Sequence, residues 1–220
     1  DINLVRIPEA VEFQTAAVLG CRFATSFRAV VDQGQLAEGQ WLAVHGCGGV
    51  GLSAIMIGAA LGARVIAVDI DREKLDFAQA AGAEFSIHAR ETDDVVSAIR
   101  EISDGGVHVS VDALGSPETC FNSVSGLRKR GKHVQVGLLS PEESNAPVPS
   151  GLIVANELEI LGSHGIQAHR YPAILEMITE GVLKPEKLIS RTVSLEEAAS
   201  ELVRMDQFSG SGISVITDFS

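Results

Sequence analysis

Cysteine and aromatic residues are scarce in this chain. Its 220 residues include three cysteines, one tryptophan and one tyrosine. Cys21, Cys47 and Cys120 are odd in number, widely spaced and without a C-x-x-C pair, which excludes a disulfide framework and a self-contained zinc knuckle. We therefore expect the protein to work in a reducing compartment, the cytoplasm.

Positive charge is also in short supply. Lysine and arginine number 17 against 29 acidic residues, and the formal net charge is −12. The acidic residues are spread along the chain, which argues against nucleic acid or an anionic membrane surface as a partner. The phosphates of any bound nucleotide must then be held mostly by backbone N–H groups.

Long hydrophobic runs are missing as well. A membrane-spanning helix needs about 18 unbroken apolar residues, and the longest candidate, 52–61, is interrupted by Ser53 and Gly58. With 45% apolar and 21% charged residues, the chain can instead bury a sizeable core. It begins at Asp1 without a methionine, and we expect it to be a fragment of a longer protein.

Strand-like and helix-like stretches alternate after residue 40, a pattern typical of a parallel sheet covered on both faces. With right-handed crossovers they predict an α/β fold, a doubly wound six-stranded parallel sheet known as the Rossmann fold. The predicted strands are 41–46, 64–69, 85–88, 108–113, 132–137 and 158–162, and the predicted helices between them are 49–61, 72–81, 92–103, 117–129 and 151–156.

Three further elements do not fit into the six-strand count. They are helices at 171–180 and 195–205 and a final strand at 212–219. The proline-containing stretch 140–150 is expected to be a mobile loop near the ligand site.

A glycine-rich turn follows the first predicted strand. Gly46, Gly48 and Gly51 have G-x-G-x-x-G spacing and precede a long helical pattern. In a dinucleotide-binding turn, the first glycine permits the tight bend, the second lets the backbone approach a pyrophosphate, and the third lets the helix close onto the strand. The N-terminus of that helix offers unpaired N–H groups to the anion. The glycine pattern alone is weak evidence, but its position between strand and helix is the required one.

A carboxylate ends the second predicted strand. Asp69 follows the glycines at close to the spacing of about 20 residues that dinucleotide-binding folds show. It can accept hydrogen bonds from both ribose hydroxyls, whereas it repels a 2′-phosphate, so the sequence favours NAD over NADP. A helix cap or a solvated strand end is the alternative for Asp69, although Asp71 is the better cap. Arg72 keeps the 2′-phosphate alternative open.

Four segments together resemble the zinc-dependent alcohol dehydrogenases of the medium-chain dehydrogenase/reductase superfamily, and the match runs along essentially the whole chain. They are 16–25, 46–51, 68–74 and 181–185. The resemblance implies an N-terminal catalytic domain whose cysteine and His-Glu zinc ligands are not among these residues. It also implies a helical segment leading in from that domain (1–30), an NAD-binding Rossmann domain (31–180) and a return to the catalytic domain (181–220).

The resemblance also implies roles for single residues. Cys21 is the third ligand of the catalytic zinc in the intact enzyme, and Thr25 lies against the nicotinamide; both are the expected catalytic residues. The alternative for Cys21 is that it is a small buried apolar side chain in a helix and binds no metal. The implied NAD contacts are Gly46, Gly48, Gly49, Val50, Gly51, Asp69, Lys74, Leu114, Val136, Gly137, Leu138 and Ser163. The alternative for Lys74 is a solvated helix lysine, and the alternative for Leu114, Val136 and Leu138 is a place in the apolar core.

The remaining chemistry-bearing residues receive no catalytic role. None of the six histidines has the spacing of a helical metal pair. Cys47 occupies the variable position of the glycine turn, and we expect it to be open to thiol reagents.

By this resemblance, the intact enzyme uses NAD and zinc to oxidise an alcohol, with hydride transfer between an alcohol or aldehyde and NAD. Zinc lowers the pKa of the bound hydroxyl, and hydride passes to the nicotinamide. The fragment itself is expected to bind NAD without turnover. The edge of the sixth strand, 158–161, alternates apolar side chains and is expected to pair with a second copy in a homodimer or homotetramer.

Three alternatives remain open from sequence. One is a zinc-free quinone or enoyl reductase of the same superfamily, which normally uses NADPH. A second is an adenosylmethionine-dependent methyltransferase, whose fold also joins a glycine-rich turn to an acidic strand end. A third is a nucleotide-sensing module without chemistry.

Overall fold

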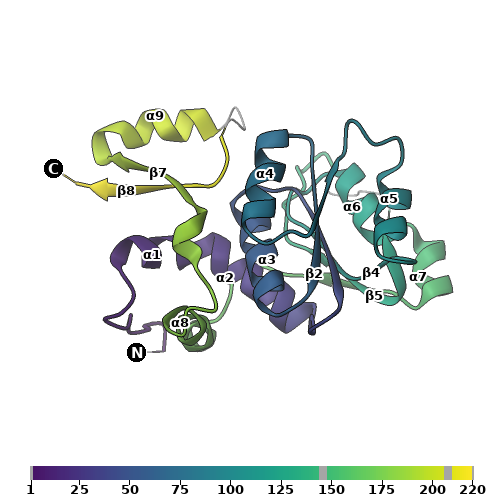
Figure 1. Cartoon of the computed structure of the whole chain (residues 1–220), viewed down its shortest axis with the longest axis horizontal. Coiled ribbons are helices and arrows are strands. Elements are labelled where there is room, and N and C mark those ends of the chain that lie inside the picture. The colour runs from purple at the N-terminus through teal and green to yellow at the C-terminus, as the bar shows by residue number, and fades with distance from the viewer. Residues whose placement is uncertain (1, 144–147, 206–209, 220) are drawn as a thin grey trace.

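The computed structural model describes residues 2–143, 148–205 and 210–219, and its central feature is one parallel sheet with helices on both faces (Figure 1). The strands of that sheet are β1 (Trp41–His45), β2 (Arg64–Asp69), β3 (Phe85–His88), β4 (Val107–Asp112), β5 (Leu127–Gln135) and β6 (Glu159–Gly162). The helices between them are α3 (Gly49–Ala60), α4 (Arg72–Ala80), α5 (Val95–Ile102), α6 (Pro117–Ser125) and α7 (Ser150–Asn156).

The strand order is β3-β2-β1-β4-β5-β6, and every neighbouring pair is parallel. The order reverses between β1 and β4, the place where open α/β sheets bind ligands. One apolar core lies under α3 and α4, with Leu42, Val44 and Val65 among its members, and a second lies on the opposite face with Trp41 and Ile66. The predicted doubly wound Rossmann fold is confirmed.

The chain before β1 forms one bent helical run beside α3 (Figure 1). It consists of α1 (Phe13–Val18), η1 (Leu19–Phe23), α2 (Ala24–Phe27) and η2 (Arg28–Gln33). Val18, Phe23 and Phe27 are buried in the core that α3 shares. This packing fixes the helical run against the glycine turn at the start of α3.

The chain after β6 returns to the N-terminal segment and packs beside it (Figure 1). It contains η3 (Ala168–Arg170), α8 (Tyr171–Thr179), η4 (Pro185–Leu188), β7 (Ile189–Ser194), α9 (Leu195–Met205) and β8 (Ile213–Asp218). The final strand, predicted at 212–219, is present, but its parallel partner β7 was not predicted. Three of the six residues of β7 are exposed, so its sequence lacks the apolar run of a buried strand.

The predicted helix 117–129 was too long. α6 ends at Ser125, and β5 begins at Leu127 with a register shift against β4 between Val107 and Val109. Leu127 is buried in the second core, which draws this stretch into the sheet. Of the predicted loop 140–150, residues 144–147 lie outside the described residues. Within the described ranges, every helix is too short or too polar to cross a membrane.

Candidate cofactor site

The glycine turn connects β1 to α3 at the carboxyl edge of the sheet. Gly46 has a φ of 90°, which favours glycine, and its N–H donates to Val68 O at 2.8 Å. A Cβ on Gly51 would lie 1.8 Å from Gly46 O, so only glycine lets the helix start this close to the strand. A Cβ on Gly48, by contrast, would meet no atom within 4 Å. Gly48 therefore borders an open space in front of the first turn of α3, which suits a pyrophosphate.

Asp69 lies beside this turn and binds it directly. Its Oδ2 accepts from Cys47 N at 2.6 Å, and its Oδ1 accepts from Ile70 N at 2.7 Å and Asp71 N at 3.1 Å. Asp71, as predicted, caps α4 by accepting from Glu73 N at 2.9 Å. Asp69 is therefore no helix cap, and its half-buried carboxylate is held next to the glycines.

Arg22 adds a positive charge to the turn, and sequence reasoning missed it. The position of a Cβ on Gly49 lies 2.6 Å from Arg22 Cδ and 3.2 Å from Arg22 Nε, so this side chain extends over the turn. Ser26, one helical turn further, donates its hydroxyl to Val50 O at 2.7 Å and ties the helical run to α3. No motif could have shown this, because Arg22 and Gly49 are brought together only by the packing of the helical run on α3.

The loops after β4 and β5 form the facing side of the site. Leu114 is 50% exposed and Leu138 is 78% exposed, so neither side chain fills the core. A Cβ on Gly137 would lie 2.2 Å from Gly115 N, so the two loops are in close contact. Ser163, after β6, is buried, and its Oγ has no hydrogen-bond partner within the described ranges. A hydroxyl in that state suits a polar ligand group such as an amide.

The carboxylate of Asp112 accepts the hydrogen bonds that hold the loop after β4 next to α6 and β5. This carboxylate is fully buried and accepts from Leu114 N at 3.0 Å and Gly115 N at 2.9 Å through Oδ1. Its Oδ2 accepts from Thr119 Oγ1 at 3.1 Å and Gln135 Nε2 at 3.0 Å. Four hydrogen bonds satisfy a buried charge. No sequence motif marks Asp112, because its partners come from three separate elements.

His45 is the residue that precedes the glycine turn, and it pairs in register with Asp112. Both ring nitrogens are buried without a hydrogen-bond partner in the part of the chain that the structure describes. Burial lowers the pKa of His45 to about 4, against an opposing effect of the Asp112 charge. The ring is therefore neutral at pH 7 and fills space in the core.

The expected reactivity of Cys47 was wrong. The side chain is fully buried behind the turn, and burial together with the Asp69 charge raises the pKa of its thiol. A buried, protonated thiol is inert toward thiol reagents. Lys74 is close enough to act electrostatically on this same thiol, which places the lysine near Asp69.

The two expected catalytic residues lie on the helical run. Thr25 is buried in α2, whereas Cys21 is exposed and borders a hollow of ≈ 370 Å³ that β8 also lines. Zinc needs about four ligands, and no group of three or more suitable side chains occurs within the described ranges. The residues described here therefore do not fit a zinc ion by themselves.

Comparison with known proteins agrees with this geometry. The family model described as zinc-binding dehydrogenase matches residues 49–180. The chain belongs to this family. Its six-stranded sheet is the cofactor-binding domain of the medium-chain dehydrogenases.

Individual members of the family support the assignment. An NAD-dependent alcohol dehydrogenase of Sulfurisphaera tokodaii is 35% identical over 205 residues, 91% of this chain and 57% of the relative. An alcohol dehydrogenase of Geobacillus stearothermophilus is 33% identical over 181 residues, 82% of this chain and 52% of the relative. The crystal structure of benzyl alcohol dehydrogenase from Acinetobacter calcoaceticus superposes with a TM-score of 0.90 at 26% identity, over 99% of this chain and 60% of that one. The chain thus spans little more than half the length of the relatives it matches.

Proposed function

We propose that this chain is the NAD-binding part of a zinc-dependent alcohol dehydrogenase. The observation that carries the proposal is the open turn at Gly48 with the Asp69 carboxylate bound beside it. In this arrangement the N–H groups that open α3 and the Arg22 side chain bind the pyrophosphate, and Asp69 accepts from the adenosine ribose. Lys74 and Leu114 complete the adenosine side.

The nicotinamide end lies toward β5 and β6 in this proposal. Val136, Gly137 and Leu138 line one side of the ring, and Ser163 offers its unpartnered hydroxyl and its backbone. Thr25 lies on the opposite side. Bound NAD supplies the hydride acceptor for an alcohol, and the chain's own residues orient it.

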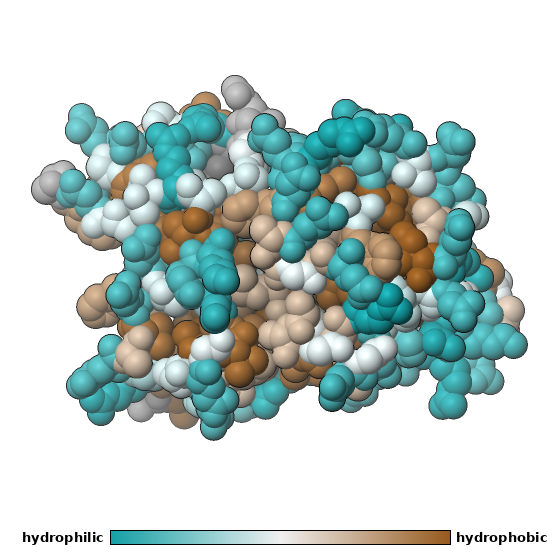
Figure 2. Space-filling view, viewed as in Figure 1, coloured by the Kyte–Doolittle hydropathy of each residue, from teal (hydrophilic) through white to brown (hydrophobic). Residues whose placement is uncertain are grey.

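The flanking segments 1–30 and 181–220 belong, in this proposal, to the catalytic domain of the whole protein, where Cys21 contributes one zinc ligand. The two segments pack on each other through contacts of α1 with η4 and β8. They also expose large apolar side chains, and Figure 2 shows apolar patches on the left of the view, where these segments lie. The exposed side chains include Ile2, Leu4, Phe13, Leu202 and Phe219. Such a surface suits contact with a further domain.

Cofactor preference tests the proposal. We expect the chain to bind NADH at least about tenfold more tightly than NADPH, because Asp69 repels a 2′-phosphate. Asp69→Ala removes this selection, so the ratio of the two dissociation constants should fall about tenfold. NADH fluorescence titration measures both constants, and the same samples should show no alcohol oxidation.

Asp71→Ala is the matched control for this experiment. It removes a neighbouring carboxylate that only caps α4, at a stability cost of about 1 kcal/mol. Its NADH to NADPH ratio should equal that of the wild type. Tighter binding of NADPH by the wild type would instead support the quinone or enoyl reductase alternative, and binding of adenosylhomocysteine without NADH would support the methyltransferase.

The β6 edge supports a proposal of self-association. β6 is the last strand of the sheet, Ile160 on it is 41% exposed, and Val154 on the adjacent α7 is 81% exposed. We expect the chain to sediment as a dimer and Ile160→Lys to sediment as a monomer, because a charge on an edge strand prevents pairing. A wild-type chain that stays monomeric at high concentration would contradict this.

A further inference from the structure

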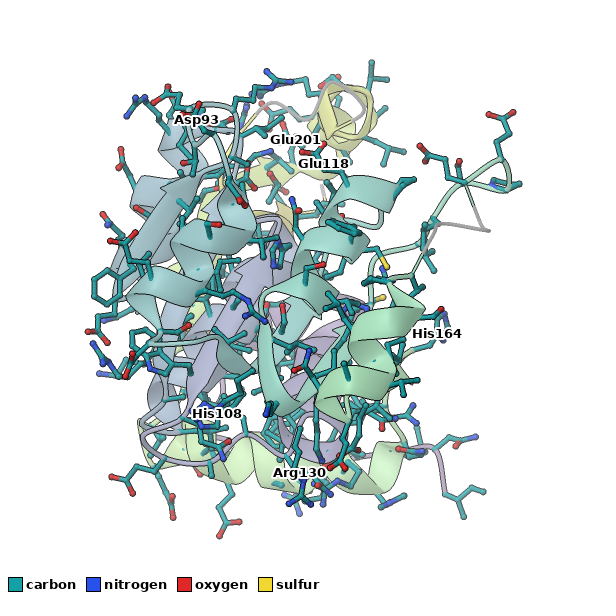
Figure 3. All side chains as sticks on the ribbon, turned by 90° about the vertical axis from the view of Figure 1, so that its right-hand side faces the viewer. Asp93, His108, Glu118, Arg130, His164 and Glu201 are labelled. Carbon is teal, nitrogen blue, oxygen red and sulfur yellow. The ribbon has the colours of Figure 1, made fainter. Side chains whose placement is uncertain are left out.

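A second hollow lies at the amino edge of the sheet, the edge opposite the glycine turn. It has a volume of ≈ 580 Å³ and is lined by the starts of β4, β5 and β6 and by residues that precede β1. Figure 3 shows His108 and Arg130 at the lower end of the molecule, whereas Glu118, at the start of α6, lies at the upper end. The hollow is therefore separate from the candidate cofactor site.

The lining carries a local excess of positive charge. Arg128, Lys129, Arg130 and Lys132 all border the hollow, in a chain whose net charge is −12. Lys132 is already engaged, since it donates to Gln35 at 2.7 Å and lies 3.7 Å from a carboxylate oxygen of β6. The other three cations form no ion pair with any residue in the described ranges.

His108 and Arg128 present two donors to each other. Trp41 N donates to His108 Nδ1 at 3.0 Å, and because a backbone N–H only donates, the proton of the neutral ring lies on Nε2. Arg128 Nη1, which can also only donate, lies 3.1 Å from that Nε2. Burial, and then the Arg128 charge, lower the pKa of His108 and keep the ring neutral. The pair lacks an acceptor, which an anion between the two groups would supply.

The backbone around the hollow is also strained. Four non-glycine residues have a positive φ within the described ranges, and three of them line this hollow: Gln35 at 51°, Arg130 at 60° and Glu157 at 51°. A left-handed conformation costs a non-glycine residue about 1 kcal/mol or more, and such residues cluster at binding sites.

We propose that this hollow binds a phosphate group, either free phosphate or the phosphate of a small phosphorylated molecule. The phosphate oxygens accept from the Arg128 guanidinium and from His108 Nε2–H, and Arg130 adds charge at the rim. A guanidinium matches the geometry of phosphate oxygens, and a dianion balances the excess of cations. The site does not depend on the proposed function, because it shares no residue with the cofactor turn.

Nuclear magnetic resonance of the uniformly ¹⁵N-labelled chain tests the proposal. Inorganic phosphate is titrated at pH 7 against chloride at matched ionic strength. We expect saturable shifts of the backbone amides of Trp41 and His108 and of the side-chain amide of Gln35. Arg128→Gln should weaken phosphate binding at least about tenfold, since it removes a charge-assisted hydrogen bond. Arg130→Gln, at an exposed position, is a second variant with the same expected direction.

Arg6→Gln is the matched control, because it removes an exposed arginine that lines a different hollow, and it should leave the affinity unchanged. A parallel titration with glycerol phosphate identifies the source of the phosphate: tighter binding than inorganic phosphate assigns the site to a phosphorylated small molecule, and equal or weaker binding assigns it to free phosphate. Shifts confined to residues 46–51, shifts that do not saturate, or unchanged affinity in both Arg128→Gln and Arg130→Gln would overturn the proposal.

Discussion

Gly51→Ala is expected to destabilise the chain by about 3 kcal/mol or more and to abolish NADH binding. The new methyl group would lie 1.8 Å from Gly46 O and 3.4 Å from Val44 Cγ1, so the helix must move away from the strand. Because the methyl group would meet a backbone oxygen, no side chain can move to relieve the contact. Urea unfolding followed by circular dichroism measures the free energy, and NADH fluorescence measures binding.

Gly48→Ala separates the effect on NADH binding from the effect on stability. Its φ of −79° suits alanine and its Cβ would meet no protein atom within 4 Å, so the stability should change by no more than about 1 kcal/mol. The methyl group does project into the space proposed for the pyrophosphate, and NADH affinity should fall at least about tenfold. Wild-type affinity in Gly48→Ala would show that the pyrophosphate does not lie on this turn.

Acid is expected to destabilise the chain through His45. The unfolded chain protonates this ring below its ordinary pKa of 6.5, whereas burial keeps the folded ring neutral down to a pKa of about 4. The unfolded state therefore binds more protons between these values, and the free energy of unfolding falls as the pH is lowered through the window. The loss attributable to His45 is about 3 kcal/mol.

His45→Leu tests this assignment, because leucine fills a similar volume and cannot titrate. Urea unfolding at pH 7 and pH 4.5 should show a smaller loss of stability in His45→Leu than in the wild type. His133, also buried, has a pKa lowered mainly by burial and contributes in the same direction in both proteins. His169→Gln, which removes an exposed histidine, is the control. An equal loss in His45→Leu and the wild type would assign the acid sensitivity elsewhere.

The sheet could be predicted from sequence because its three central strands, β2, β1 and β4, are short, largely buried runs bounded by turn residues. All five residues of β1 are buried, and their apolar run is visible without a structure. β7 has no such run, since among the described residues it pairs with β8 alone and leaves Ser190, Arg191 and Thr192 exposed. Its existence depends on a partner more than twenty residues away, which local pattern cannot show.

The parts of the candidate site also differ in whether local sequence can reveal them or whether they depend on distant segments. The glycine turn and Asp69 follow from spacing, because each needs only its own strand and turn. Arg22 and Asp112 act through contacts that the fold creates between distant segments. For Cys47, local sequence was misleading. Its place in the turn predicted that thiol reagents could reach it, but the turn directs its side chain into the core.

The bond between Asp69 and Cys47 N has a consequence for redesign of the cofactor preference. In the proposed binding mode, one carboxylate both holds the bend and selects the sugar, so replacing it to admit a 2′-phosphate also removes the acceptor of Cys47 N. A specificity switch in this scaffold therefore requires two coordinated changes, one that accommodates the new phosphate and one that supplies a substitute acceptor for the orphaned amide.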